Sequence, residues 1–172
     1  MRTAIRAIIL FFLVLWLGGV LFFPIVAATA FSTISDTHAA GTIVAKCLRI
    51  LHYEGFVSGA IIVLLLLLGQ WTRAFARSVI APVVMALIML GLTAWSQFSI
   101  IPRMESYRIA AGGAIDAVPP TNPNRVAFNK LHGTSEHVEE GVLLAGIVLI
   151  VLIAWNHPAS NYPAASPVLP RS

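Results

Sequence analysis

The stretch AIILFFLVLWLGGVLFFPIVAATAF, residues 7–31, decides the fold class of this protein. It holds no Asp, Glu, Lys or Arg in 25 consecutive positions, and a helix that crosses a bilayer needs about 20 mostly apolar residues. The stretch ends with Ala28-Thr29-Ala30, a pattern typical of signal-peptide cleavage sites. The apolar core of a secretory signal has only about 7–15 residues, however. We therefore predict an uncleaved first membrane helix.

Three further stretches lack charged side chains and predict three more helices. They cover residues 55–72, 78–102 and 141–170. Prolines end the apolar part of the last stretch after Trp155, so the second and fourth helices reach full length only by including polar residues. The prediction is an all-α polytopic membrane protein with four transmembrane helices in an up-down bundle, near residues 6–31, 48–71, 78–101 and 124–156. Residues 1–156 are expected to form one membrane domain, followed by a Pro-rich cytoplasmic tail at 157–172.

The overall composition excludes several classes of protein. Of the 172 residues, 58% are hydrophobic and 10% charged, and the mean hydropathy is +0.87, whereas a soluble domain carries about 25% charged residues. The net charge of +4 is too sparse for the basic face that nucleic-acid binding needs. Cys47 is the single cysteine, which excludes an internal disulfide and a cysteine-based zinc site. The composition therefore indicates a membrane protein that does not bind nucleic acid.

The distribution of charges predicts the orientation of the helices. Arg2 and Arg6 begin the chain, and Arg73 and Arg77 occupy the short turn between the second and third helices. Positive charges in short flanks favour the cytoplasmic side, and all seven acidic residues fall on the opposite side. We therefore expect both termini to be cytoplasmic.

The two connections on the outer side have different patterns. Residues 32–53 begin with helix-capping residues around Asp36 and continue with helical spacing, which predicts an amphipathic stretch at the interface that runs on into the second helix. Residues 103–122 contain Gly112-Gly113 and predict a loop. Asn122-Pro123 then predicts the N-cap and first position of the fourth helix, which begins outside the bilayer.

Polar side chains near the outer ends of the second and fourth helices form the candidate site. His132, Glu136 and Glu139 share one helix face, and His52 and Glu54 lie at the same outer depth. Ionisable groups at membrane depth usually face the bundle interior, where they pair or bind a ligand. Imidazole and carboxylate groups suit a divalent transition metal, and two imidazoles can take the axial positions of a haem iron. The hypothesis is a metal site of His132, His52, Glu136 and Glu139, centred on His132, with haem as the alternative cofactor.

The same residues have a simpler interpretation. His52 and His132 hydrogen-bond to backbone or carboxylate groups where the bundle meets water, and the glutamates anchor the helix at the interface. The sequence contains no HExxH or Glu-x-x-His motif. Ser135 lies on the same helix turn as His132 and outside any G-x-S-x-G motif, so we do not expect an enzyme. Both interpretations remain open at this point.

Four glycines are candidates for close helix packing. Gly55 and Gly59 form a G-x-x-x-G motif in the second helix, which permits close approach of another helix. Gly18 and Gly19 in the first helix are expected to supply the opposing surface, within the chain or between copies.

Several motifs occur in the order found in a known family. They are Trp16-Leu17-Gly18-Gly19, His52-Tyr53-Glu54-Gly55, Ile101-Pro102-Arg103 and Phe128-Asn129-Lys130-Leu131-His132-Gly133-Thr134-Ser135. The chain resembles the four-helix membrane proteins typified by transmembrane protein 205, whose bacterial relatives share domain of unknown function 4149. The resemblance implies a four-helix fold in the bacterial inner membrane, without an established enzymatic activity. Where relatives tend to have a small polar residue after the serine, this chain has Glu136-His137.

Three function hypotheses follow. The first is a small binding protein that holds a metal ion or haem between the second and fourth helices near the outer face. The second is a structural or accessory subunit of a larger membrane assembly. The third is a transporter, which is the weakest because no charged side chain falls in the middle of the bilayer. The expected partners are the lipid bilayer and either a second copy of the chain or a larger membrane complex.

Overall fold

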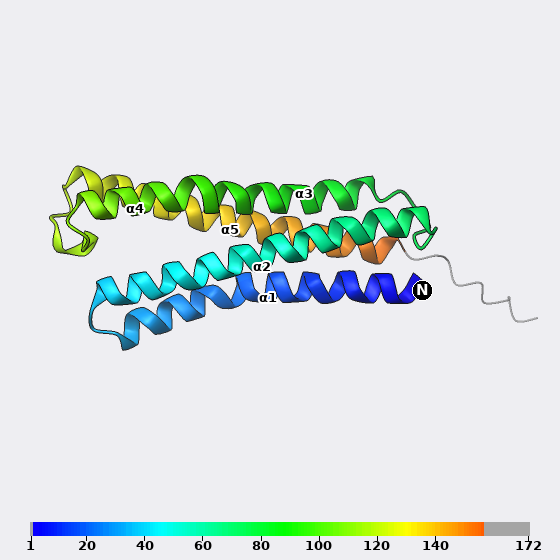
Figure 1. The fold of residues 1–172 in the computed structure, drawn as a ribbon, viewed down its shortest axis with the longest axis horizontal. Coiled ribbons are helices and arrows are strands. Elements are labelled where there is room, and N and C mark those ends of the chain that lie inside the picture. Colours follow the sequence, from blue (N-terminus) through cyan, green and yellow to red (C-terminus); the bar gives the residue numbers. More distant parts are fainter. Residues whose placement is uncertain (1, 157–172) are drawn as a thin grey trace, which may run out of the picture.

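The computed structural model describes residues 2–156 as helices joined by short connections (Figure 1). The α-helices are α1 (Arg2–Thr33), α2 (Thr37–Trp71), α3 (Ile80–Trp95), α4 (Ile101–Ala110) and α5 (Pro123–Trp155). A π-helix, η1 (Ser96–Ile100), joins α3 to α4, and a 3-10 turn, η2 (Ile115–Ala117), precedes α5. The predicted tail at 157–172 lies outside the described residues.

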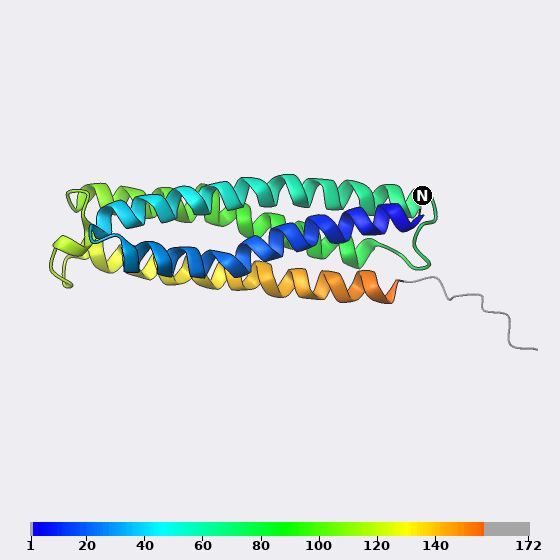
Figure 2. The same cartoon turned by 90° about the horizontal axis from the view of Figure 1, so that it is seen from below.

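The helices form four long antiparallel rods, because α3, η1 and α4 run on as one rod (Figures 1 and 2). Each rod is long and apolar enough to cross a membrane. α1 packs mainly against α2, and α3 packs mainly against α5. The predicted all-α up-down bundle with four membrane-spanning helices is therefore confirmed. We call the end with residues 34–36 and 111–122 the loop end, and the opposite end, with residues 2 and 156, the terminal end.

The helix starts on the loop end agree with the predicted capping residues. The Asp36 carboxylate accepts hydrogen bonds from the backbone N–H groups of His38 and Ala39, and the Asn122 side chain caps α5 in the same way. α2 is continuous from Thr37, so its first half belongs to the bundle and does not lie as a separate segment along the interface. The cap at Asp36 stabilises this early start.

The third rod is longer than predicted. It continues through Pro102 to Ala110, where residues 103–122 were predicted to be a loop. Pro102 lies in the first turn of α4, directly after the π turn, where the regular pattern of α-helical hydrogen bonds is already interrupted. The loop starts at Gly112 and Gly113, whose φ values of 87° and 93° are accessible to glycine without strain.

The core runs along the centre of the bundle towards the terminal end. Its fully buried large side chains are Trp16, Ile9, Leu13, Ile62, Leu66, Met89 and Leu149. Trp16 fills the notch made by the G-x-x-x-G motif. A Cβ atom at Gly55 would lie 2.5 Å from Trp16 Nε1, and one at Gly59 would lie 2.5 Å from Leu90 Cδ2 and 2.9 Å from Trp16 Cζ3. The surface opposite this motif is therefore formed by the Trp16 indole and, at Gly59, also by Leu90, where Gly18 and Gly19 were expected.

The two glycines of α1 differ in their surroundings. A Cβ atom at Gly19 would lie 2.5 Å from Leu51 Cδ1, so Gly19 is a close-packing position between α1 and α2. A Cβ atom at Gly18 would meet nothing within 4 Å, so the structure does not use Gly18 for packing. Gly146 on α5, which the sequence analysis did not single out, accommodates Leu17.

The terminal end is closed by hydrogen bonds between distant segments. Arg6 is buried, donates to the backbone carbonyl of Asn156 and lies with its Cζ atom 5.1 Å from the centroid of the Phe75 ring. The Asn156 side chain accepts from Arg77 N–H at 2.7 Å and donates to Arg77 C=O at 3.2 Å. These contacts tie α1, the 72–79 turn and the end of α5 together.

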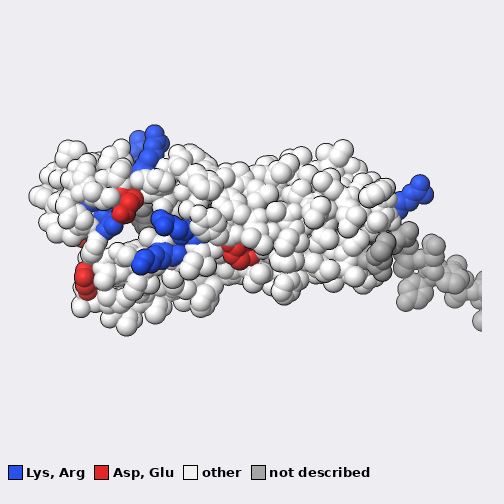
Figure 3. Space-filling model, viewed as in Figure 1, with Lys and Arg blue, Asp and Glu red and all other residues white. Residues whose placement is uncertain are grey.

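Charged side chains gather towards the loop end. Figure 3 shows Lys, Arg, Asp and Glu clustered there, while most of the visible surface between the two ends is uncharged. The charge-free stretch of α2 starts directly after Glu54 and that of α5 directly after Glu140. From there to Trp71 and Trp155 these stretches span about 26 and 22 Å at 1.5 Å per residue, less than the hydrocarbon core of about 30 Å. The polar residues just before them therefore lie at the edge of the hydrocarbon core.

A buried histidine between three helices

His52 of α2 lies at the centre of a polar site inside the bundle. Its side chain is only 1% exposed and contacts two other rods. Nδ1 lies 2.8 Å from Oε1 of Gln97 in η1, and Nε2 lies 2.8 Å from Oε1 of Glu139 in α5. The Glu139 side chain is 17% exposed. Both ring nitrogens are thus engaged, and one imidazole links α2, η1 and α5.

The hydrogen-bond partners of His52 are both oxygen atoms. The Gln97 amide oxygen is an acceptor, so Nδ1 of His52 donates to it. Nε2 of His52 forms a hydrogen bond with the Glu139 carboxyl group. This pairing lowers the cost of keeping two ionisable groups in a low-dielectric interior.

The π-helix η1 places Gln97 at the site. A π turn inserts an extra residue into a helix and rotates the following side chains relative to a regular α-helix. Ser96 and Gln97 are both buried in this turn, and Thr93 is buried one turn before it. The hydroxyl groups of Thr93 and Ser96 have no hydrogen-bond partner within residues 2–156. The site therefore continues as a buried polar stripe along the third rod.

The structure brings together only two of the four predicted metal ligands. His52 and Glu139 are in contact, whereas His132 and Glu136 pair with each other, with 3.5 Å between Nε2 and Oε1. The His132 and Glu136 side chains are 60% and 65% exposed. His132 precedes Glu139 by two helical turns, about 10 Å at 1.5 Å per residue. The predicted central residue therefore lies farther towards the loop end than the buried site.

The donor set does not complete a metal site. Within residues 2–156, no three His, Cys, Asp or Glu side chains lie close enough to hold one metal ion. A tightly bound zinc ion takes three or four protein ligands, and His52 with Glu139 supplies two. The separation of His132 from His52 also does not favour haem, because axial ligation requires two imidazoles facing the same iron.

The sequence analysis missed the role of Gln97, although one signal was present. Thr93, Ser96 and Gln97 recur at helical spacing in an otherwise apolar helix, and polar groups with such spacing usually face other protein groups in the membrane. The sequence could not show that a π turn directs the Gln97 amide to His52, because the turn depends on how the third rod packs.

Comparisons with known proteins give a family and no characterised relative. No curated protein and no solved structure matches the chain significantly, so the resemblance to transmembrane protein 205 remains a prediction. Residues 11–112, more than half of the chain, match a domain of unknown function, DUF4149. The match includes His52 and Gln97 and ends before α5. The chain therefore belongs to the DUF4149 family.

Proposed function

We propose that this chain is a small integral membrane protein that responds to pH through the buried pair of His52 and Glu139. The single observation that supports this function is the 2.8 Å contact between Nε2 and Oε1 in a site where the imidazole is 1% exposed. Ionisable groups at membrane depth are costly and are usually functional. The proposed ligand is a proton, which His52 and Glu139 share at hydrogen-bond distance without a third ligand group.

The pair couples protonation to helix packing. Loss of the shared proton leaves the Glu139 carboxylate facing the lone pair of a neutral His52, and gain of a second proton leaves an imidazolium without its counter-charge. Either change places an uncompensated charge between α2, η1 and α5 and favours their separation. A pH change on the loop-end side, nearest the site, would thus alter the packing of three helices.

We place the loop end on the outer side of a bacterial inner membrane, with both termini in the cytoplasm. The support is the charge pattern. Arg73 and Arg77 occupy the short 72–79 turn at the terminal end, and short basic segments favour the cytoplasmic side. With this orientation, the His52 site lies nearer to the outer surface of the membrane than to the cytoplasmic surface.

Nuclear magnetic resonance of the purified full chain tests the proposal directly. With ¹⁵N in the histidine rings and ¹³C in the glutamate carboxyl groups, we expect the His52 and Glu139 signals to titrate together. His52→Gln assigns the signal of the His52 ring, and Glu139→Gln should uncouple that signal from the carboxyl group. His132→Gln is the matched control, because His132 belongs to an exposed pair. Independent titration of His52 and Glu139 would refute the proposal.

Metal analysis of the same samples distinguishes between the three functions that the sequence suggested. A metal ion or haem could copurify with the wild type and be lost in His52→Gln. That result would show that the site binds a metal ion or haem, and it would refute the proposal that its ligand is a proton. An accessory subunit of a larger assembly predicts a third outcome, in which neither ligand nor coupled titration is seen and the chain purifies from mild detergent with a stoichiometric protein partner.

A further inference from the structure

A shallow groove of about 410 Å³ lies between α1 and α2 on the outside of the bundle. Its walls are apolar except at Glu54 and Ser58, and its lining consists of Phe12, Leu15, Ile50, Tyr53, Glu54, Val57 and Ser58. Ile50, Tyr53 and Val57 are more than half exposed. The groove thus opens towards the surroundings of the helices, away from the His52 site.

Glu54 gives this groove an unusual chemistry. Its Oε1 atom accepts a hydrogen bond from the hydroxyl of Ser58, one turn later on α2. Its Oε2 atom is buried and has no hydrogen-bond partner among the described residues. A buried carboxylate oxygen without a hydrogen-bond partner is costly. One hydrogen-bond donor is therefore missing at this groove, and a positively charged donor suits a carboxylate best.

The position of Glu54 along α2 indicates what supplies that donor. Glu54 immediately precedes the charge-free stretch 55–72, so it lies at the level of the lipid headgroups. Tyr53 beside it is half-exposed, as is typical of aromatic residues in the interfacial belt. A groove with one carboxylate and otherwise mostly apolar walls matches an amphiphile whose headgroup carries a positively charged hydrogen-bond donor.

We propose that the groove between α1 and α2 binds a phospholipid with a primary ammonium headgroup, phosphatidylethanolamine. The ammonium group donates to Oε2 of Glu54, and an acyl chain lies along Phe12, Leu15 and Val57. A primary ammonium forms a charge-assisted hydrogen bond with a carboxylate. The trimethylated ammonium of phosphatidylcholine has no N–H and cannot replace it, so the site selects between two zwitterionic lipids.

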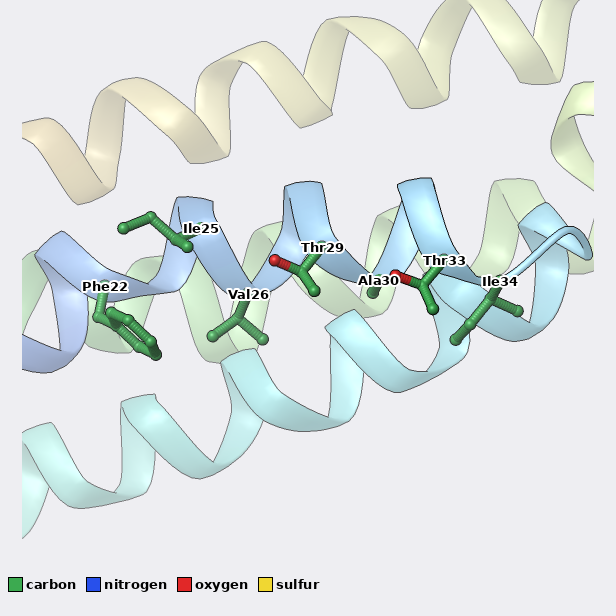
Figure 4. A pocket seen from close by; sticks show the side chains of 7 residues that line it. All are labelled: Phe22, Ile25, Val26, Thr29, Ala30, Thr33 and Ile34. Carbon is green, nitrogen blue, oxygen red and sulfur yellow. The ribbon is translucent and has the colours of Figure 1, made fainter.

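A second groove on α1 provides an internal comparison. It has a similar volume, about 390 Å³, and its lining contains no ionisable side chain (Figure 4). The lining residues are Phe22, Ile25, Val26, Thr29, Ala30, Thr33 and Ile34. A lipid chain in this groove would be held by apolar contacts alone, without selection for a headgroup. The two grooves differ mainly in Glu54.

Native mass spectrometry of the purified full chain tests the proposal with two lipids that have identical acyl chains. We expect the wild type to bind phosphatidylethanolamine roughly tenfold more tightly than phosphatidylcholine, the size of one charged hydrogen bond. Glu54→Gln should remove this preference. Glu136→Gln is the control, because Glu136 is an exposed carboxylate outside the groove.

A second pair of variants tests the groove without changing Glu54. Val57→Trp fills the groove and should reduce phosphatidylethanolamine binding, whereas Thr29→Trp fills the α1 groove and should not. Circular dichroism confirms that each variant retains its helical content. Equal binding of both lipids to the wild type, no binding of phosphatidylethanolamine, or an unchanged preference in Glu54→Gln would overturn the proposal.

Discussion

Nε2 of His52 lies 2.8 Å from Oε1 of Glu139, although 87 positions separate the two residues in the sequence. The contact joins α2 to α5, and His52 donates on its other side to Gln97 in the third rod. A single imidazole thus links three of the four rods at the level where the charge-free stretches begin. The stability of the bundle should therefore depend on the protonation of this pair.

Glu139→Gln and His52→Gln should change the pH dependence of thermal stability in opposite ways, one in alkaline and the other in acid solution. The wild-type pair holds one proton, so we expect its midpoint of thermal unfolding in detergent to fall in both acid and alkaline solution. Glu139→Gln has no buried carboxylate to ionise and should lose the alkaline fall only. His52→Gln has no imidazole to protonate and should lose the acid fall only. His132→Gln should keep both limbs, and a wild-type midpoint independent of pH would contradict this account.

Gln97 and Ser96 are neighbours in η1 and should respond differently to alanine. Gln97→Ala removes the acceptor of Nδ1–H in a buried site, so we expect a loss of about 1–3 kcal/mol in the free energy of unfolding. Ser96→Ala removes a buried hydroxyl that has no partner within residues 2–156, so its effect should be neutral or stabilising. Reversible unfolding in mixed detergent measures both. Equal losses would show that Gln97 does not stabilise the imidazole.

Gly55 and Gly18 test the packing of α1 against α2. A methyl group at Gly55 overlaps the buried indole of Trp16, and overpacking of this kind costs about 1–3 kcal/mol. Gly18→Ala adds a methyl group where nothing lies within 4 Å. It should stabilise the helix by up to about 1 kcal/mol, because alanine has the higher helix propensity. The same unfolding assay measures both substitutions, and a well-tolerated Gly55→Ala would contradict the packing.

Reporter fusions test the proposed orientation. A reporter that is active only in the cytoplasm should be active when fused after Ser172. A tag inserted between Gly112 and Gly113 should be accessible from the outer side, because the loop end has the opposite location. A C-terminal fusion that is active only outside the cytoplasm would invert the orientation and place the His52 site near the cytoplasmic surface.

The number and order of the four membrane-spanning rods could be predicted from the sequence alone. Charge-free stretches mark membrane spans because each residue contributes separately to the cost of burial in hydrocarbon. The caps at Asp36 and Asn122 and the turn at Gly112-Gly113 were also predictable, since they depend on neighbouring backbone groups. The level of the polar site followed from the short apolar stretches of the second and fourth helices. These features all arise from interactions within a few residues.

Which polar side chains meet depends on the tertiary structure. His132, Glu136 and Glu139 share a helix face in the sequence pattern, yet the first two lie exposed farther towards the loop end, and only Glu139 is at the axial position of His52. The π turn directs Gln97 to the same imidazole, and Trp16 occupies the notch at Gly55. Such contacts depend on the rotation and axial position of each rod relative to its neighbours. Side-chain packing along the whole bundle sets these quantities, and no local pattern encodes them.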